Sequence, residues 1–429
     1  MKARLLFLLL CLPLLLCACG GTVSAGPAEP APAALEESPE PPPAPEAPDV
    51  PDGPPEPSEP EPPEPTVATL AVCGDAMSHM PVTNDAWNGE RYDYARIMAA
   101  AKPYVAAADY AVVNLETTLS GGPPYSGYPA FNSPDDLARD LKSLGFDLCL
   151  TANNHCLDRG FSGLARTLDV LDEVGLRHVG TSRTQEECDH NLAVADVGGL
   201  SVAFLGYTYG TNGIPVPKKH PYAVNVFNTD YLTTLSQPDW DRLAGDLEAA
   251  KALETDLIAV MIHWGLEYKL TQNQYQEELA DFLFQHGADV VLGGHSHVPQ
   301  PMELRALPDG RQGFVCYSLG NFISSQTKPN TDITAVLTLT LTRDNETGEA
   351  QVTDYAYVPL YMLHRAEGAS PRFELVDVHA ALEDEEIGDT LRQKLNGALE
   401  TCHAVFGEER DAGKSTRKKR RPSRDGASV

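Results

Sequence analysis

Polar side chains that can bind metal ions or move protons follow five short apolar segments of the chain. They are Gly74-Asp75-Ala76-Met77-Ser78-His79, Glu116, Thr151-Ala152-Asn153-Asn154-His155, His263-Trp264-Gly265-Leu266-Glu267-Tyr268 and His295-Ser296-His297. Each feature is weak alone, because Gly-Asp is typical of a turn and a single histidine at a strand end is usually structural. Together, the carboxylates, amide and imidazoles form the donor set that Mn, Fe or Zn accepts.

The elements that must position these residues lie between Val67 and about Leu399. Strands are predicted at 67–73, 110–115, 146–150, 202–207, 257–262, 289–292 and 314–318, and helices at 94–108, 134–144, 163–174, 240–253 and 274–285. Apolar strands separated by helices indicate a sheet that is covered on both faces. Two further strands, 335–340 and 351–358, have no helix between them, which predicts a second, mixed sheet that is partly antiparallel. We therefore expect an α/β two-sheet sandwich flanked by helices.

The predicted topology also places the polar residues together. Ligand sites in open α/β sheets lie beyond the carboxyl ends of the strands, which is where these side chains occur. Two carboxylates buried there without a cation would repel each other and would face a large desolvation cost. The sequence therefore predicts a divalent metal site, of Mn, Fe or Zn, at this edge.

The N-terminus predicts export. Residues 1–18 carry Lys2 and Arg4 before an apolar run of about 12 residues, which is shorter than the roughly 20 that span a bilayer. This pattern is typical of a signal peptide. The end of the run, Leu16-Cys17-Ala18-Cys19-Gly20, resembles the lipobox of bacterial lipoproteins. That resemblance implies that Cys19 is acylated and holds the protein in the cell membrane, on its extracytoplasmic face.

Composition separates the ends of the chain from its folded part. Residues 20–66 contain 17 of the 35 prolines and 11 acidic residues, with no Lys or Arg, so we expect an extended tether. Residues 414–421 are mostly basic. We divide the chain into a signal peptide at 1–18, a lipidated cysteine and tether at 19–66, a folded domain at 67–400 and a basic tail at 401–429 that we expect to be disordered.

The charge of the folded part restricts its partners. The chain carries a net charge of −29, of which the signal contributes +2, residues 20–66 contribute −11 and residues 414–429 contribute +6, leaving −26 for residues 67–413. A domain this acidic is a poor binder of nucleic acids. It would also repel an anionic polymer unless cations lie between them.

Several motifs together resemble one known family. They are GD-x-M near the start, NLET, TANNH-x-x-D-x-G-x-x-GL, HWG-x-EY, GADVV-x-GGHSHV-x-QP-x-E and YSLGNF. They look like the CapA family of capsule and poly-γ-glutamate synthesis proteins, which is similar in fold to the calcineurin-like metallophosphoesterases. The resemblance covers residues 67 to about 330. The tether and the basic tail fall outside it.

The resemblance implies roles for the motif residues. Asp75 and His297 match ligands of a first metal, and Glu116 matches the ligand that bridges two metals. Asn154, His263 and His295 complete the second metal, and His155 matches the histidine that protonates or steadies the leaving group. The phosphoesterases have histidine two residues after the first aspartate, whereas this chain has Met77. One metal site is therefore well supplied, and the other lacks a ligand unless His79 replaces it.

Other polar residues near the motifs allow more than one interpretation. Asp158 either hydrogen-bonds an imidazole or caps the helix that begins near Phe161. Arg159 either contacts an anionic substrate or is solvated. Glu267 and Tyr268 are candidates to line the cleft, and Asn321 either faces the site or forms a structural turn.

The resemblance implies a part in the synthesis, export or anchoring of an anionic envelope polymer such as poly-γ-glutamate. The implied partners are the membrane, through Cys19, and a membrane synthase complex. Two other functions remain open. The first is a metal-dependent phosphoester or amide hydrolase acting on an envelope substrate, with His155 and Asp158 as its catalytic residues. The second is a scaffold that binds the polymer without catalysis.

Overall fold

The computed structural model describes residues 62–189 and 192–413. The signal peptide, Cys19, most of the tether and the basic segment from residue 414 lie outside these ranges. None of the helices in the described ranges is both long and apolar enough to cross a membrane.

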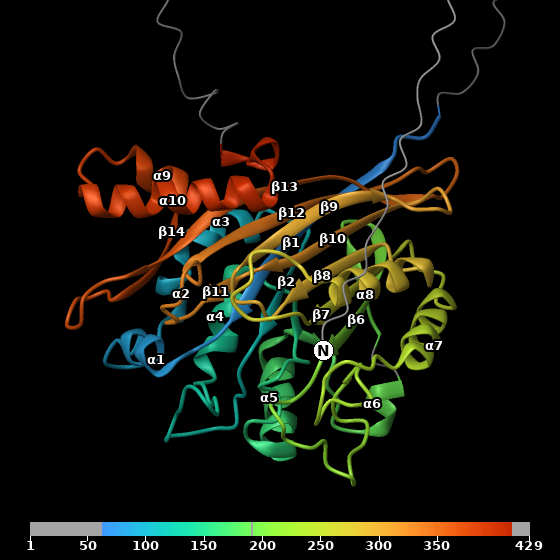
Figure 1. Cartoon of the computed structure of the whole chain (residues 1–429), viewed down its shortest axis with the longest axis horizontal. Coiled ribbons are helices and arrows are strands. Elements are labelled where there is room, and N and C mark those ends of the chain that lie inside the picture. Colours follow the sequence, from blue (N-terminus) through green and yellow to red (C-terminus); the bar gives the residue numbers. More distant parts are fainter. Residues whose placement is uncertain (1–61, 190–191, 414–429) are drawn as a thin grey trace, which may run out of the picture. The chain divides into compact units, whose positions relative to one another are not determined.

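The first of two sheets has eight strands and contains the N-terminal part of the domain (Figure 1). Its order is β14-β13-β12-β1-β2-β3-β4, with β11 paired to β1. Strands β1 to β4 are parallel. On the other side of β1, β12 pairs with β1, β13 with β12 and β14 with β13, and all three pairs are antiparallel. The bounds are β1 Thr66–Ala76, β2 Tyr110–Leu115, β3 Leu148–Leu150, β4 Arg177–Val179, β11 Asn321–Ile323, β12 Ile333–Arg343, β13 Ala350–His364 and β14 Phe373–Asp377.

The second sheet has six strands in the order β5-β6-β7-β8-β10-β9. Strands β6, β7, β8 and β10 are parallel, and the two edge strands pair in antiparallel fashion. The bounds are β5 Ala193–Val197, β6 Leu200–Thr208, β7 Leu257–His263, β8 Val290–Gly294, β9 Pro299–Ala306 and β10 Gln312–Leu319.

Helices cover the outer faces of both sheets (Figure 1). The first sheet packs against α1 Met80–Ala86, α2 Tyr94–Ile97, η1 Ala99–Ala101, α3 Lys102–Val105, α4 Asp136–Leu144 and α5 Gly160–Val174. The second packs against α7 Trp240–Lys251 and α8 Gln274–Gln285, and α6 spans Gln185–Asp189. The hydrophobic core between the two sheets extends to α10 Asp389–Phe406. Helix α9 Val378–Glu383 and the 3-10 helix η2 Glu408–Arg410 lie near α10.

The predicted α/β two-sheet sandwich is confirmed. Buried residues alternate along β1, so that Leu70 and Val72 face the other sheet while Ala71 and Cys73 face the helices. The prediction that the late strands belong to the second sheet is wrong. They extend the first sheet instead, because β12 pairs along β1 from Thr66 to Val72.

Two helix boundaries differ from the sequence pattern. The helix predicted at 94–108 is broken into α2, η1 and α3, and Pro103 lies in the first turn of α3. Proline has no amide hydrogen to donate and clashes with the preceding turn, so the helix restarts there. At the other end, α10 extends past residue 400, where composition placed the end of the domain.

Candidate metal centre

The ends of parallel strands from both sheets converge on one buried cluster of side chains. Asp75 lies near the end of β1 and Glu116 directly follows β2, while His263 ends β7. His295 and His297 follow β8, the neighbour of β7 in the second sheet. All five residues are buried, with at most 4% of their surface exposed.

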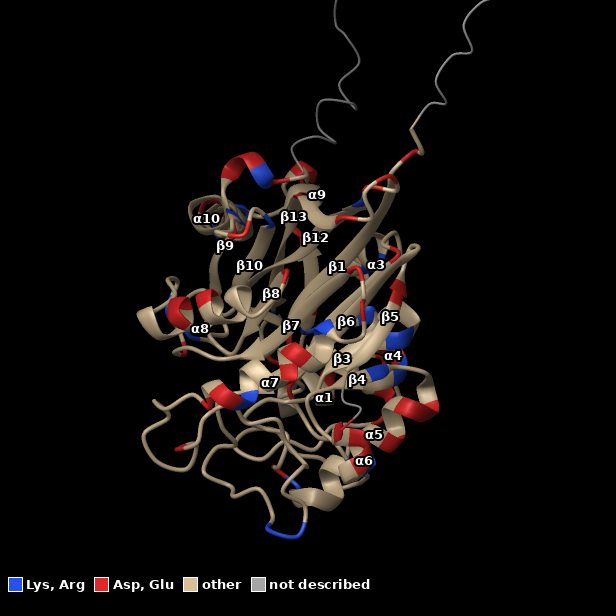
Figure 2. Ribbon diagram, turned by 90° about the vertical axis from the view of Figure 1, so that its right-hand side faces the viewer, with Lys and Arg blue, Asp and Glu red and all other residues tan. Residues whose placement is uncertain are grey.

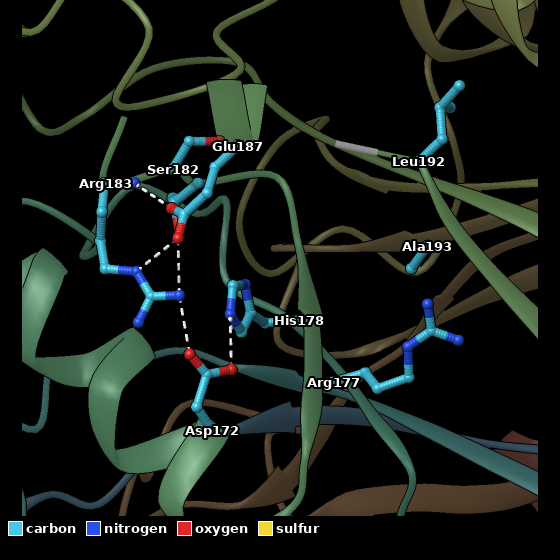
Figure 3. Close-up of a pocket in the computed structure, with 9 residues that line it drawn as sticks. Asp172, Arg177, His178, Ser182, Arg183, Glu187, Leu192 and Ala193 are labelled. Carbon is cyan, nitrogen blue, oxygen red and sulfur yellow. Dashed lines mark hydrogen bonds and ion pairs between the residues drawn. The ribbon is translucent and has the colours of Figure 1, made fainter. Parts of the chain in front are cut away.

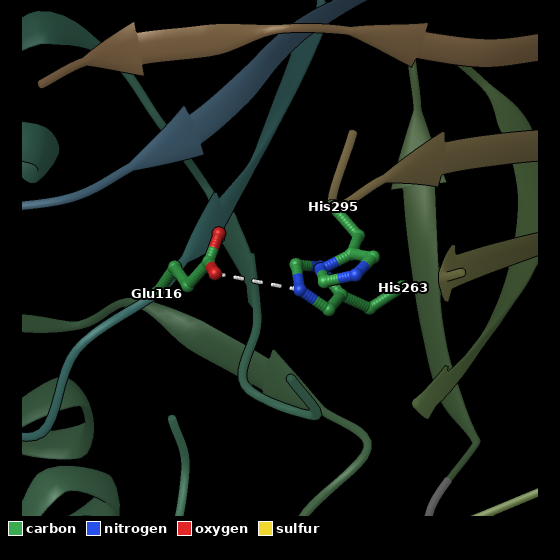
Figure 4. A group of neighbouring side chains, drawn as sticks. All are labelled: Glu116, His263 and His295. Atoms are coloured by element: carbon green, nitrogen blue, oxygen red, sulfur yellow. Dashed lines mark ion pairs between the residues drawn. The ribbon is translucent and has the colours of Figure 1, made fainter. Parts of the chain in front are cut away.

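Glu116 is the clearest sign that this cluster can hold a cation. Within the described chain, neither of its carboxylate oxygens has a hydrogen-bond partner, although the residue is fully buried. Oε1 lies 3.4 Å from His263 Nε2 and 3.9 Å from His297 Nε2, and Figure 4 shows the carboxylate directed at the ring of His263. A buried carboxylate without donors is costly, and a divalent cation supplies the missing interaction.

The donors form two groups that share Glu116. In each group the ligand atoms lie within 4.8 Å of one another. The first group is Glu116, His263 and His295, and the second is Asp75, Glu116 and His297. The Nδ1 atom of His295 is also buried without a hydrogen-bond partner in the described ranges, whereas Nδ1 of His297 lies 3.4 Å from Asp75 Oδ2. Nitrogen and carboxylate donors at this spacing fit Mn, Fe or Zn.

The charges of the cluster support the same interpretation. Burial raises the pKa of Asp75, but the hydrogen bond from His297 and the charges of His263 and His297 outweigh it and lower this pKa. Burial lowers the pKa of His297, yet Glu116 and Asp75 raise it to about 9. Burial and the neighbouring imidazoles hold the pKa of His295 well below its usual value. A cation that binds here must displace the proton of His297.

The loop after β8 holds its imidazoles in a rare backbone conformation. His295 and His297 have φ angles of 88° and 57°. Residues other than glycine rarely adopt this left-handed region, and such strain clusters at functional sites. The backbone N–H of His295 donates to Asp75 Oδ2 at 3.1 Å. A side chain at Gly294 would come within 2.7 Å of Asp75 Oδ1, so this position must be glycine.

A layer of amides, to which the sequence analysis assigned no supporting role, lies behind the cluster. The Asn114 side chain donates to Asp75 Oδ1 at 2.8 Å, and its Nδ2 lies 3.2 Å from His263 Nδ1. Asn153 donates to Asn114 Oδ1 at 3.2 Å. Asn114 precedes Glu116 by two residues, so period-two alternation along the extended chain places both on the same side, a signal that was available in the sequence.

Asn154 lies where its carbonyl oxygen can serve as a ligand. Its Oδ1 is 2.9 Å from His263 Nε2, and its Nδ2 donates to Asn212 Oδ1 at 3.0 Å. Asn212 lies in the long segment after β6, with a φ of 49°. Because the amide nitrogen of Asn154 is held by Asn212, its oxygen points to the metal ligands. No sequence pattern distinguishes Asn212 from other exposed loop amides.

Replacing Asn212 by alanine is expected to weaken cation binding on the order of tenfold, because the Asn154 amide becomes free to rotate. Titration of the metal-free protein with Mn²⁺ measures this change. Asn396→Ala, on the exposed side of α10, is the matched control and should leave the affinity unchanged. Equal affinities for the two variants would contradict the role of Asn212.

His155 and Asp158 form a hydrogen-bonded pair next to the cluster. His155 Nδ1 lies 2.7 Å from Asp158 Oδ2, which also accepts from the Phe131 backbone at 2.7 Å. The alternative role of Asp158 as a helix cap is wrong, since Arg159 occupies that position and no side chain caps α5. The His155 charge contributes to the lowered pKa of His295, which places both imidazoles in one electrostatic environment.

Two of the remaining candidates, Arg159 and Asn321, form hydrogen bonds within the protein scaffold rather than with the cluster. Arg159 is exposed and bonds Ser126 Oγ and the Ala130 carbonyl. The amide nitrogen of Asn321 donates to Gln326 and Thr331 at 3.0 Å each, so it stabilises a turn.

Three candidates lie around the cluster. His79 contacts Phe131 with ring centroids 5.0 Å apart and belongs to none of the ligand groups in the described ranges. The Tyr268 ring is 6.0 Å from that of His297. Glu267 forms a further group with His295 and His297.

A separate pocket of about 280 Å³ lies beside β4 and α5 (Figure 3). Its charged groups neutralise one another, since Arg183 pairs with Asp172 at 2.7 Å and with Glu187 at 2.6 Å. It contains none of the residues that the motifs singled out. The metal-ligand cluster is therefore the stronger candidate for function.

Comparison with known proteins agrees with the motifs. Residues 69–326 match the model of the bacterial capsule synthesis protein family PGA_cap. The chain is 29% identical over 263 residues to the capsule biosynthesis protein CapA of Bacillus anthracis, covering 60% of each chain. It is 26% identical over 304 residues to the PGA biosynthesis protein CapA of Bacillus subtilis, covering 70% of this chain and 69% of that one.

A crystal structure described as a novel phosphatase, from Mycoplasma pneumoniae, is only loosely similar. Its TM-score is 0.40 at 13% identity, over 69% of this chain and 95% of the other. The family match, in contrast, covers more than half of the sequence and includes the residues of the candidate metal centre from Asp75 to His297. The chain therefore belongs to the bacterial capsule synthesis protein family PGA_cap.

Proposed function

We propose that this protein is a lipid-anchored component of the outer face of the cell membrane. It takes part in the synthesis, export or anchoring of an anionic capsule polymer such as poly-γ-glutamate, together with a membrane synthase complex. It acts through a divalent-cation centre, and the observation that carries this part is the buried carboxylate of Glu116, which faces His263 without a hydrogen-bond partner in the described chain. Family membership and the relative named for PGA biosynthesis support the polymer.

The acidic surface of the domain explains why binding of an anionic polymer would require a cation. Acidic side chains are spread over α5, α6, α7 and α8 (Figure 2), and residues 67–413 carry a net charge of −26. This surface repels a polyanion. A bound divalent cation supplies local positive charge to which a polymer carboxylate can coordinate.

Replacing His263 by alanine in the producing bacterium is expected to reduce cell-associated polymer at least about tenfold, since metal-ligand removal disrupts the centre. The polymer is measured as glutamate released from washed cells by acid hydrolysis. His286→Ala, at the C-terminal end of α8, removes an imidazole outside the ligand groups and should leave the polymer unchanged. Wild-type polymer levels with His263→Ala, at equal protein abundance, would overturn the role of the centre.

Hydrolysis of a phosphoester or amide bond is the second candidate function. Two donor groups that share one carboxylate resemble the paired sites of hydrolases, where bound cations activate water and polarise the substrate. In this chain, Asp158 holds Nδ1 of His155 at 2.7 Å and fixes the orientation of the ring. Nε2 is then the atom that would give a proton to the leaving group.

If the protein is a hydrolase, His155→Ala should lower kcat about 10² to 10⁴-fold, because the proton donor is lost. The measurement uses a chromogenic phosphodiester with Mn²⁺ added, and metal content serves as the control because His155 belongs to none of the ligand groups in the described part of the chain. Equal turnover in both proteins would exclude His155 as the acid.

A further inference from the structure

The described residues contain a third donor group that no motif-based assignment explains. Glu267, His295 and His297 have ligand atoms within 4.8 Å of one another. Glu267 is exposed, whereas the two histidines are buried. It therefore brings a carboxylate from the surface to the side of the centre where His297 lies.

The position held by Asp75, Glu116 and His297 has room for a further ligand. These residues supply three side chains, and a Zn²⁺ site of four ligands is completed by a fourth side chain in structural sites or by water in catalytic ones. Met77 is buried and offers no nitrogen. His79 does not replace it, because its Nδ1 lies 3.5 Å from the Ser325 backbone nitrogen and it belongs to none of the donor groups in the described ranges.

The backbone fixes Glu267 beside the imidazoles. The next residue, Tyr268, donates its backbone N–H to the carbonyl of Ser296 at 2.8 Å. Ser296 lies between His295 and His297, so the loop after β7 is tied to the loop that carries both ligands. Tyr268 has a φ of 62°, which turns the chain at this contact. The spacing of Glu267 is thus set by main-chain pairing between the two loops.

The buried imidazole of His295 gives independent evidence of a missing ligand. His295 exposes 4% of its surface, and its Nδ1 atom has no hydrogen-bond partner among the described residues. Buried ring nitrogens are normally paired, so an unpaired one within a group of metal-binding donors points to a cation at this position.

We propose that Glu267, which forms a donor group with His295 and His297, is an additional ligand of the metal centre on the side of the cation held by Asp75, Glu116 and His297. The proposal rests on the metal centre that the proposed function requires. It makes the centre a two-cation site, with Glu116, Asn154, His263 and His295 holding the other cation.

Titration of the metal-free full-length protein with Mn²⁺ tests the proposal without an activity assay. Binding is monitored by calorimetry and by the loss of the electron paramagnetic resonance signal of free Mn²⁺. The wild-type protein is expected to bind two cations. Glu267→Gln is expected to keep one and to bind the second on the order of tenfold more weakly or worse. Glu303→Gln, an exposed carboxylate paired with Arg305 on β9, is the matched control and should behave as wild type.

Glu267→His restores a donor atom and should recover much of the second binding event, which separates ligation from a general effect of charge. Wild-type binding of both cations by Glu267→Gln would overturn the role of Glu267 and leave the metal centre intact. Failure of the wild-type protein to bind Mn²⁺, Fe²⁺ or Zn²⁺ would overturn both this inference and the proposed function.

Discussion

Replacing Glu116 by glutamine is expected to abolish the stabilisation that divalent cations give to this protein. Glu116 belongs to two of the three donor groups, and neither of its oxygens has a hydrogen-bond partner in the described chain. Glutamine keeps the shape but removes the negative charge. At about 100 times Kd, one bound cation stabilises a folded protein by about 2.7 kcal/mol, so loss of two sites is a large effect.

Thermal unfolding with Mn²⁺ and with a chelator measures this stabilisation. The wild-type Tm should rise with Mn²⁺, and the Tm of Glu116→Gln should not change. Glu303→Gln serves as the control for removal of a carboxylate elsewhere. Circular dichroism in chelator shows whether the variant is folded. A metal-dependent rise of wild-type size in folded Glu116→Gln would show that this residue is not a shared ligand.

Replacing Asp411 by asparagine is expected to destabilise the domain by about 3 kcal/mol, because it removes a buried carboxylate that is hydrogen-bonded to two imidazoles. The Asp411 carboxylate is fully buried and lies 2.8 Å from Nε2 of both His379 and His403. It thereby joins α9 and α10, and the adjacent Ala412 donates its backbone N–H to the Tyr357 carbonyl in β13 at 2.9 Å.

The effect of Asp411→Asn should depend on pH. Burial raises the pKa of Asp411, but the hydrogen bonds from His379 and His403 outweigh it and lower this pKa below 3.8. A depressed carboxyl pKa stabilises the fold above the unfolded value and loses this contribution as the pH falls through the folded value. Wild type and variant should therefore differ in urea unfolding at pH 7 and converge well below pH 3.8.

Asp354→Asn provides the control for this segment. Asp354 pairs with Arg410 but is 62% exposed, so its removal should cost no more than about 1 kcal/mol. If Asp411→Asn were as mild as Asp354→Asn, residues 401–413 would not belong to the cooperative fold.

The residues of the candidate site could be found from the sequence because the strands are parallel. Parallel strands end at the same edge of a sheet, so Asp75, Glu116 and His263 could be located by reading the residue after each apolar run. The pattern of apolar residues along the sequence also predicted β2 at 110–115 and α8 at 274–285 with their observed bounds. The α8 cap is local too, since Asn273 and Gln276 form a capping box.

Features set by distant pairing could not be found in this way. The choice of sheet for β12 depends on its contact with β1, more than 250 residues earlier, and no local pattern encodes it. Asn212 acts on Asn154 from a loop of the other sheet. Glu267 was identified as a residue of the cleft, but its placement beside His297 depends on the pairing of Tyr268 with Ser296.

The metal content of the purified full-length protein tests the central claim most directly. The protein is purified without chelators, dialysed against metal-free buffer and measured by elemental mass spectrometry, beside Glu116→Gln. We expect two equivalents of Mn, Fe or Zn per wild-type chain and none in Glu116→Gln. A wild-type protein that stays metal-free, even after incubation with each of these cations, would contradict the account.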